Sequence, residues 1–507
     1  MHRYPLIAIL IPLIIYILLV DTFYQRPSPR YPKEQTPYLV EVLGTPVKRN
    51  KTWRMPVAVL AYKRADSSIW QKENQSKAIL YLMVDKEVPV PTRSERLWLD
   101  ARMTSITDST AALPSYYQKY LYHNGYPFTA VIYPNKWSKY PENLLPDLYN
   151  ETPLRRNIIA HFERQRHRLV NYYHTLFSTH ETHATLFPSS ASSDRFSLLE
   201  SLSIGQRQHL SETVKTNFSA SGISHLLALS GFHLMILLLP FYWWKKFDRR
   251  LGSRIIQALL IVLVMSYFTL LSGAPVSLCR ASLLLACCYI LSLFDAQVST
   301  LNNLFLVAII MLLIHPFWLF DVGFQLSFVA VLSIQLFLPL LTIPIAGKNA
   351  VGDQTTRWYK RSIKYLWDPL SVALAAQIGT FPLVLYHFNQ FALYAIVASV
   401  VMIPIITPLL YLAWGMPLLH LVWASPSLDH LLSPILSALL GAMLFVAQQV
   451  NQFPGASIHF QHLQWFELIL NYVAVYFVYR LLKTKKFLFY SLLLVILIFS
   501  LLILSRF

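Results

Sequence analysis

The stretch GISHLLALSGFH, residues 222–233, places His225, Ser230, Gly231 and His233 in an otherwise apolar segment. Imidazole and hydroxyl groups can transfer protons, bind metals or form hydrogen bonds, and in hydrocarbon they are costly without a polar partner. The two histidines are eight residues apart, so a regular helix directs both toward a common side. A helix break at Gly231 would instead expose backbone groups that only protein or water can satisfy. Either geometry predicts a polar interior, although a histidine that only forms a hydrogen bond between helices is the simpler interpretation.

Further polar side chains stand inside later apolar runs. Arg280 lies early in GAPVSLCRASLLLACC, and Asp321 and Gln325 are four residues apart, on one helix face. Gln377 lies in SVALAAQIGTFPLVLYHFN. Intramembrane charges are expected to face protein or water and to mark a pathway. Because Arg280 and Asp321 each stand near the outer end of a run, a pair that reaches the membrane surface is the alternative.

The composition indicates a polytopic membrane protein. Of the 507 residues, 55% are hydrophobic and only 13% are charged, and long apolar runs are frequent. The three cysteines all stand in apolar runs, so we expect neither a disulfide framework nor a thiolate zinc site. The net charge of +18 suits an anionic partner, or lysines and arginines that set membrane orientation.

The apolar runs predict about eleven transmembrane helices. Residues 1–24 are expected to be an N-terminal anchor rather than a cleaved signal peptide, because bulky residues follow the run. Residues 225–507 are predicted to form a polytopic domain, and one crossing is favoured for 391–423. The predicted spans of this domain are 225–244, 255–272, 276–294, 301–320, 322–345, 370–386, 391–414, 432–450, 464–482 and 487–505.

Basic loops predict the orientation. Lysines and arginines cluster in loops 245–254, 346–369 and 483–486, whereas the alternate loops 386–391 and 451–463 contain none. The positive-inside rule assigns the basic loops to the cytoplasm. The N-terminus is then cytoplasmic as well, and the region between the anchor and the polytopic domain is extracytoplasmic.

That outer region has two predicted parts. Residues 30–145 contain short strand-like runs near 38–47, 54–63, 77–84 and 127–134, which predict a small β domain. Residues 150–220 include an amphipathic helical linker that begins near Thr152. Between Arg30 and Lys215, Lys and Arg outnumber Asp and Glu by 25 to 17, which suits nucleic acid or anionic lipid. The aromatic side chains proposed for base stacking are Trp53, Trp70, Trp98, Tyr116, Tyr117 and Trp137.

Four motifs carry a family resemblance. GISHLLALSGFHL, GAPVSLCRASLLL, HPFWLFDVGFQLSFVAVLSI and AAQIGTFPLVLYHFNQF, in this order, resemble the membrane competence domain of the ComEC family of DNA-uptake channels. Residues 36–140 resemble the extracytoplasmic OB-fold domain of that family. The resemblance implies passage of single-stranded DNA through the bacterial inner membrane into the cytoplasm during natural transformation. The residues expected to line the DNA path are His225, Ser230, Gly231, His233, Arg280, Asp321, Gln325, Ser327 and Gln377, and Phe324 also matches the third motif.

The resemblance also implies partners. No GxxxxGK[ST] phosphate loop occurs, so strand pulling would need a separate cytoplasmic ATPase or helicase motor, besides a periplasmic DNA receptor and membrane lipid. The HxHxDH motif of the family's metallo-β-lactamase-like domain is also absent, so we expect no enzymatic activity and a possible separate nuclease. No cofactor or metal is expected, because the spacing of His174, His180 and His183 fits no standard site.

Two alternatives remain at this stage. A small-solute secondary transporter would also use broken helices and buried charges, but it predicts internal repeats that the helix block does not display. A membrane-embedded enzyme would use His225 and His233 as acid–base or metal groups, with Asp321 as the one obvious carboxylate. Neither alternative explains a basic OB-like domain outside the membrane.

Overall fold

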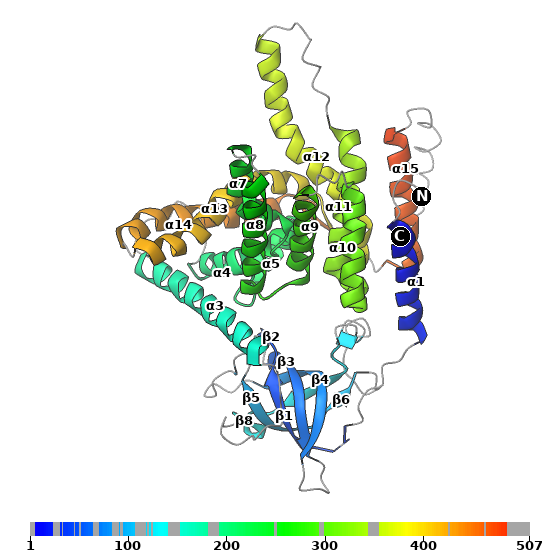
Figure 1. Cartoon of the computed structure of the whole chain (residues 1–507), viewed down its shortest axis with the longest axis vertical. Helices are drawn as coiled ribbons and strands as arrows, with labels where there is room; N and C mark the ends of the chain where they lie inside the picture. Colours follow the sequence, from blue (N-terminus) through cyan, green and yellow to red (C-terminus); the bar gives the residue numbers. More distant parts are fainter. Residues whose placement is uncertain are drawn as a thin grey trace. The chain divides into compact units, whose positions relative to one another are not determined.

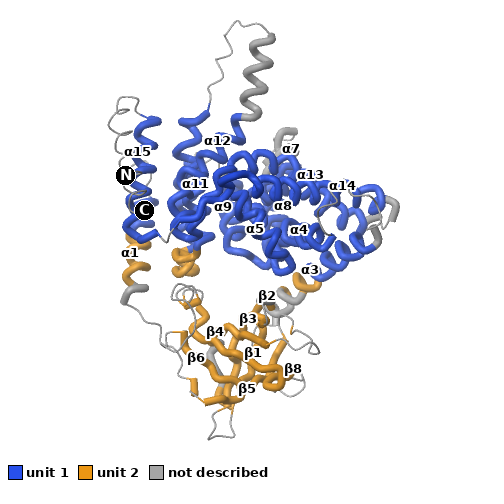
Figure 2. Tube along the Cα trace, turned by 180° about the vertical axis from the view of Figure 1, so that it is seen from behind, with its two compact units in different colours: residues 1–11, 165–311, 322–507 blue, residues 12–164, 312–321 orange. Residues whose placement is uncertain are grey.

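The computed structural model describes most of the chain and divides it into two compact units. The first unit comprises Met1–Ile11, Gln165–Met311 and Val322–Phe507, and the second comprises Pro12–Arg164 and Leu312–Asp321 (Figure 2). The described residues are 6–23, 31–32, 34–44, 46–49, 52–63, 70–83, 91, 95–106, 118, 121–122, 125–139, 153–180, 192–247, 251–293, 299–342, 354–423, 426–460 and 463–483.

The second unit is built around one β-sheet with the strand order β6-β7-β4-β3-β1-β5-β8, in which β2 pairs with β3 (Figure 1). The pairs β1–β3, β3–β4 and β1–β5 are antiparallel, and β4–β7 is parallel. The strands are β1 (Thr36–Val42), β2 (Val47–Arg49), β3 (Thr52–Lys63), β4 (Trp70–Met83), β5 (Arg96–Ala101), β6 (Thr104–Ser105), β7 (Phe128–Ile132) and β8 (Trp137–Lys139). Strands therefore occupy all four predicted strand regions, and β5, β6 and β8 are additions.

Alternating side chains explain how this sheet forms a core. On β3, Met55, Val57 and Val59 are fully buried in one hydrophobic cluster, together with alternate residues of β1, β4, β5 and β7. Because successive strand residues point to opposite faces, Arg54 and Pro56 lie on the other face of β3. The β-branched and aromatic content of these runs favours strands, and burial of one face stabilises them.

The first unit is helical. Helices α1 (Ile7–Phe23), α3 (Pro153–His180) and α10 (Thr300–Ile314) contribute residues to both units. The other helices are α4 (Ser192–Ile204), α5 (Glu212–Ala220), α6 (Ser224–Leu227), α7 (Gly231–Phe247), α8 (Leu251–Leu271), α9 (Val276–Leu293), α11 (Val322–Leu341), α12 (Gln354–Phe388), α13 (Ala395–Trp423), α14 (Pro426–Gln452) and α15 (Trp465–Lys483). A short ribbon pairs β9 (Gln390–Ala392) with β10 (Ser457–His459).

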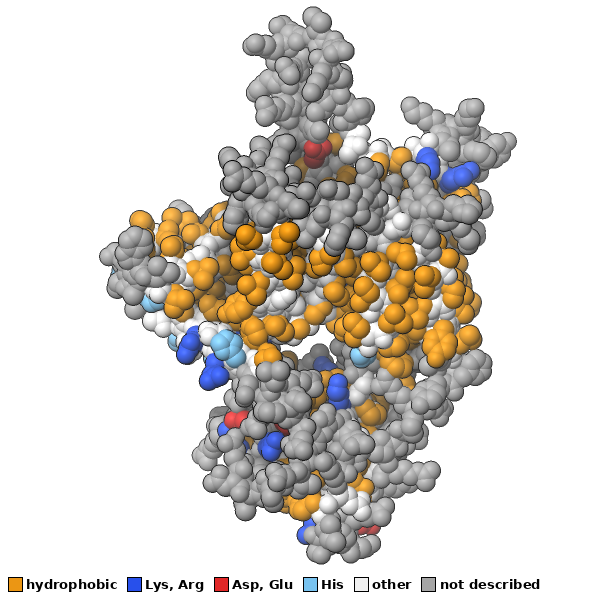
Figure 3. All heavy atoms as spheres, viewed as in Figure 1, with side chains coloured by type: hydrophobic (Ala, Val, Ile, Leu, Met, Phe, Trp, Pro, Cys, Tyr) orange, Lys and Arg blue, Asp and Glu red, His pale blue; other side chains and the backbone are white. Residues whose placement is uncertain are grey.

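Five of the described helices are long and apolar enough to cross a membrane. These candidate spans lie at Val322–Leu341, Trp367–Phe388, Ala395–Leu421, Leu428–Gln452 and Trp465–Lys483. Helices also occupy the other predicted spans but have shorter apolar parts, and the predicted span 487–505 lies outside the described residues. On the face shown in Figure 3, hydrophobic side chains form a broad band over the helical unit. The chain is therefore a membrane protein, and eleven crossings stay a prediction.

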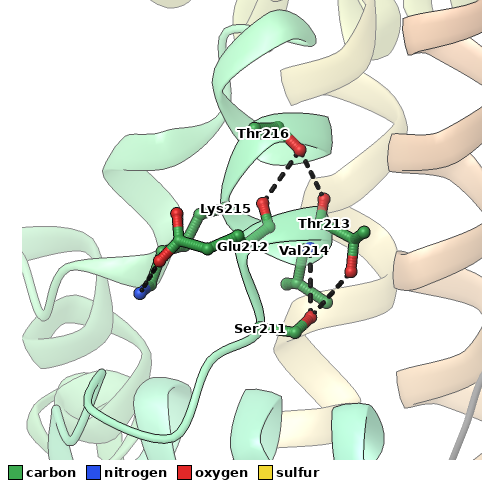
Figure 4. Close-up of polar contacts among 6 residues, drawn as sticks. All are labelled: Ser211, Glu212, Thr213, Val214, Lys215 and Thr216. Carbon is green, nitrogen blue, oxygen red and sulfur yellow. Dashed lines mark hydrogen bonds and ion pairs between the residues drawn. The ribbon is translucent and has the colours of Figure 1, made fainter. Parts of the chain in front are cut away.

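The predicted span 225–244 is not one continuous helix. It consists of α6, a break at residues 228–230, and α7. Just before it, α5 begins at a sequence-encoded cap, in which the Ser211 Oγ accepts a hydrogen bond from the Val214 N–H at 3.3 Å (Figure 4). Glu212 in the first turn adds a favourable charge at this helix end. The start of α5 at Ser211 and the break at residues 228–230 fix where the first polar motif, residues 222–233, lies along the chain's helices.

Candidate functional site

The polar residues of the first motif start a helix inside an apolar segment. Helix α6 ends at Leu227 and α7 begins at Gly231. The Ser230 Oγ accepts a hydrogen bond from the Phe232 N–H at 3.3 Å, and the Ser230 N–H donates to the His233 Nδ1 at 3.3 Å. This reciprocal arrangement is a capping box, with histidine in the position usually held by Glu or Gln. The motif therefore satisfies backbone donors that hydrocarbon could not.

Hydrogen bonding also assigns the tautomer of His233. The side chain is fully buried, at 0% exposure, and its Nδ1 accepts the Ser230 N–H. In the neutral imidazole the proton is then on Nε2. Nε2 has no hydrogen-bond partner among the described residues, so His233 retains a donor that its capping role does not use. His225 lies on α6 with an exposed side chain, so the two histidines do not share one helix.

The break before α7 packs against α9. A Cβ at Gly231 would lie 3.2 Å from the Cβ of Ala281, so a larger residue there would press on α9. The Ser277 Oγ donates to the Leu229 carbonyl oxygen at 2.9 Å and satisfies a backbone acceptor at the break. The first motif is thereby fixed next to the helix that carries Arg280.

Arg280 connects α9 with α11. Its side chain is buried, at 4% exposure, and its Nη1 donates to the carbonyl oxygens of Gly323 at 3.0 Å and Phe324 at 3.3 Å. The guanidinium carbon lies 5.3 Å from the ring centroid of Phe328, within cation–π range. In this conformation the charge is held by protein groups. To bind a phosphate, the Arg280 guanidinium would have to release the carbonyl oxygens of Gly323 and Phe324.

The remaining predicted site residues fall on α11, on α12 and at Asp321. Gln325 meets His387, with 2.9 Å between Oε1 and Nε2. Ser327 on α11 and Gln377 on α12 are partly buried. Asp321 follows a 3-10 turn and belongs to the second compact unit, whereas the others belong to the first. His387 was missed because 62 residues separate it from Gln325, and no local pattern predicts their contact.

Helices α11 and α12 approach closely beside this pair. A Cβ at Gly379 would lie only 2.5 Å from the Cβ of Ser333. The Ser333 Oγ donates to the Ala375 carbonyl oxygen at 2.6 Å. Small residues at such a crossing allow backbones to approach within a membrane, and a hydroxyl then bridges them. Gly379 and Ser333 thus hold the two helices that carry Gln325 and His387.

The second unit has an outward face with aromatic and basic side chains. Strand register aligns Arg54 of β3, Tyr81 of β4 and Val131 of β7 in one row, on the face opposite the core. Lys77 on β4 is exposed, and its Nζ lies 6.0 Å from the ring centroid of Tyr126. Cations beside flat rings are the combination that single-stranded nucleic acids require.

Three basic side chains on the sheet are paired with acids, which reduces the positive field expected from composition. These ion pairs are Lys136–Asp100 at 3.3 Å, Lys139–Glu95 at 3.0 Å and Arg96–Glu41 at 4.0 Å. Such partly exposed pairs contribute little to stability. Lys77, which is exposed beside Tyr126 and on the same face of β4 as Tyr81, is therefore the cation that we consider first for a phosphate contact.

The tryptophans proposed from sequence mostly have structural roles. Trp53 and Trp137 pack against the main β core, and Trp70 packs against a smaller cluster. Trp98 is partly buried on β5, opposite Leu39. Tyr116 and Tyr117 lie outside the described residues. Tyr81 and Tyr126, which were missed, also pack against a small cluster, formed by Ile79, Ile106 and Leu121, on the face of β4 opposite the main core.

The described residues contain no group of three or more His, Cys, Asp or Glu side chains arranged to hold a metal ion. Of the three histidines considered for a metal, His174 packs edge-on against Phe196, with 5.7 Å between ring centroids. His183 lies outside the described residues.

Comparisons with known proteins concern mainly the helical unit. A family model described as "Competence protein" matches residues 202–485. The chain is 30% identical over 215 residues to ComE operon protein 3 of Bacillus subtilis (strain 168). That alignment covers 42% of this chain and 25% of the relative, so the chain matches about a quarter of the relative's length. No solved structure matches the chain.

Proposed function

Because this chain belongs to the competence protein family, we propose that it passes single-stranded DNA through the bacterial inner membrane into the cytoplasm during natural transformation. The observation that carries the proposal is a set of buried polar side chains inside the family-matched apolar segment. His233, Arg280 and the Gln325–His387 pair come from four helices and lie within one compact unit. Intramembrane polar groups of this kind mark pathways.

Each group has a proposed role. The Nε2–H of His233 offers a neutral donor to a passing phosphate oxygen. Arg280 supplies a permanent positive charge, held by backbone carbonyls until a phosphate replaces them. Gln325 and His387 offer polar contacts to sugars or base edges, while Ser230 caps α7 and Gly231 lets it pack closely against α9. These roles require no covalent chemistry, so the proposed protein is a channel and not an enzyme.

We infer that the second unit is an OB-like domain on the extracytoplasmic side. The antiparallel pairs β1–β3, β3–β4 and β1–β5, with a parallel β4–β7 pair, support a five-stranded Greek-key barrel. The outward face of β3 and β4, which carries Arg54, Lys77 and Tyr81, corresponds to the face with which such barrels bind oligonucleotides. This domain would receive the strand before it enters the helical unit.

The proposed partners follow from the same task. A cytoplasmic ATPase or helicase would pull the strand, and a periplasmic receptor would deliver it. A separate nuclease would process the other strand. The proposed orientation keeps the N-terminus in the cytoplasm, with about eleven crossings, because the basic loops then share the cytoplasmic side.

Uptake of labelled DNA tests the proposal. Competent cells that carry the full chain, a deletion, Arg280→Ala or Arg280→Lys are compared for cytoplasmic DNA and for transformants, with membrane levels of each variant measured. We expect the deletion and Arg280→Ala to stop entry while DNA still accumulates outside the inner membrane. Arg280→Lys should retain partial uptake, because it keeps the charge but loses the planar fork. Gly415→Ala, where nothing lies within 4 Å of the added Cβ, is the matched control.

Normal transformation in the deletion strain would refute the channel function. Small-solute transport would then be the hypothesis to test. Normal uptake by Arg280→Ala at full membrane level would instead remove Arg280 from the path and leave the channel function intact.

A further inference from the structure

Helices α13 and α14 carry an apolar surface that the described protein leaves uncovered. Between Val397 and Tyr411 the exposed positions of α13 recur every three or four residues and form a stripe along the helix, and residues 418–421 at its end are all exposed. The stripe positions are Val397, Val401, Pro404, Pro408 and Tyr411. On α14, Leu431, Ile435 and Phe445 continue the surface, with 66%, 49% and 39% exposure. Hydrocarbon is the partner that such a surface fits.

The opposite side of the same hairpin is covered by polar helices along its whole length. Near the α13–α14 connection, the Tyr172 hydroxyl of α3 donates to the Asp429 Oδ1 at 2.7 Å. Further along α14, Arg195 of α4 donates to the Ser437 Oγ at 3.2 Å. At the other end, the Asn451 Nδ2 donates to the Asn217 Oδ1 of α5 at 2.9 Å. Leucines, methionines and alanines of α13 and α14 fill the core between these layers.

The three contacts span a distance comparable with the membrane. From Asp429 to Asn451 the chain advances 22 residues along α14, or about 33 Å at 1.5 Å per residue. The hydrocarbon core of a bilayer is about 30 Å thick. If α14 crossed the bilayer, then α3, α4 and α5 together would have to follow it through the full depth of the hydrocarbon.

The covering helices and their loops carry charges that exclude this arrangement. The side chains of Arg168, Arg207 and Glu212 are exposed, and the fully buried Glu200 pairs with His209 at 2.7 Å. A charge at the centre of a bilayer is strongly unfavourable, so such charges are found facing protein or water. A layer that carries them belongs beside water.

The two ends of the hairpin are also joined. Strand β9 leads into α13 and pairs with β10, which follows α14, so the hairpin enters and leaves at one place. Figure 1 shows α13 and α14 running across the direction of α8, α9, α11 and α15, and Figure 2 shows the same from behind. Helices that cross each other in this way cannot all be perpendicular to one membrane.

We propose that α13 and α14 form a hairpin that lies along the membrane plane and does not cross the bilayer. Its exposed stripe contacts lipid acyl chains, and its other side carries the polar layer of α3, α4 and α5. With this arrangement the two crossings predicted at 391–414 and 432–450 are both lost. Because an even number of crossings is removed, the basic loops stay on the sides of the membrane assigned to them. It also applies whatever solute or polymer the helical unit conducts.

Depth measurement tests the hairpin in the full chain. Starting from a variant whose three native cysteines are replaced by alanine, single cysteines are introduced as Val397→Cys, Pro408→Cys and Leu418→Cys and labelled with bimane. The protein is reconstituted in phosphatidylethanolamine–phosphatidylglycerol vesicles with nitroxides at shallow or deep acyl positions. A hairpin in the membrane plane predicts the same ratio of shallow to deep quenching at all three positions.

Helix α15 supplies the internal reference, because it is a candidate span with exposed positions along its length. Phe466→Cys, Val473→Cys and Leu482→Cys should show deep quenching only at the middle position. The proposal is overturned if Pro408→Cys is quenched deeply while Val397→Cys and Leu418→Cys are quenched at shallow depth, since that is the pattern of a crossing helix. DNA uptake by each labelled variant is measured separately, so its loss does not affect the depth result.

Discussion

His233 has two separable functions, and one substitution series can distinguish them. Replacement by alanine removes the Nδ1 acceptor of the Ser230 N–H, which costs about 1–2 kcal/mol for a helix cap. It also empties a fully buried site, which adds about 2 kcal/mol or more for the cavity. We therefore expect His233→Ala to lower the stability of the purified protein in detergent by about 3–4 kcal/mol.

His233→Gln is the informative comparison, because a glutamine oxygen at this position can accept the same N–H, as in the usual capping box. Its stability should lie within about 1 kcal/mol of the wild-type chain, while the imidazole Nε2–H is replaced by an amide NH2 at a different position. Thermal unfolding and DNA uptake are measured on the same preparations and strains. If transport requires the imidazole donor at its own position, His233→Gln restores stability and leaves uptake low.

Two results would contradict this reasoning. Equal loss of stability in the alanine and glutamine variants would mean that the Nδ1 contact does not cap α7. Full uptake by a stable His233→Gln variant would mean that the path does not require the imidazole ring of His233.

Two further predictions concern packing and pH. Gly379→Ala should lower stability and membrane level, because its Cβ would lie 2.5 Å from a serine Cβ on α11. Gly415→Ala, the control, should be neutral or stabilising by up to about 1 kcal/mol. Thermal unfolding of both variants checks this prediction, and similar unfolding temperatures for the two variants would contradict the close approach of the helices. The hydrogen bond from His209 to Glu200, at 2.7 Å, raises the pKa of His209 above its ordinary value of 6.5. The protonated pair therefore stabilises the fold fully below about pH 6.5 and loses this contribution as the pH rises through the folded pKa. Unfolding temperatures across this range should fall more steeply for the wild-type chain than for His209→Gln, and parallel curves would refute the linkage.

The regular elements could largely be predicted from sequence because their periodicity is local. The alternation in β1, β3, β4 and β7 and the long apolar runs of the helical unit each carry their own signal. Strand β5, in RLWLDA, alternates as well, but it is short and follows a stretch rich in charges and prolines. Its assignment depends on pairing with β1, 55 or more residues away, which no local pattern contains.

The candidate site was less predictable, because its residues acquire partners through the fold. Arg280 could be recognised as an unusual charge, but its carbonyl partners at Gly323 and Phe324 have no sequence signature. The capping box could have been recognised, since Ser230 and His233 have the required spacing of three residues. It was missed because histidine replaces the usual Glu or Gln.

The contrast between two helix boundaries suggests where this unit could widen. At Gly379 and Ser333 the backbones of α11 and α12 are so close that separating them would break a short hydrogen bond and create a void. Across the α9–α11 boundary, a long arginine side chain provides the polar link, and its rotatable bonds can lengthen without losing the charge. Helices α11 and α12 would then move together as one rigid body. The Arg280 side chain would extend and keep α9 linked to α11 while these two helices separate.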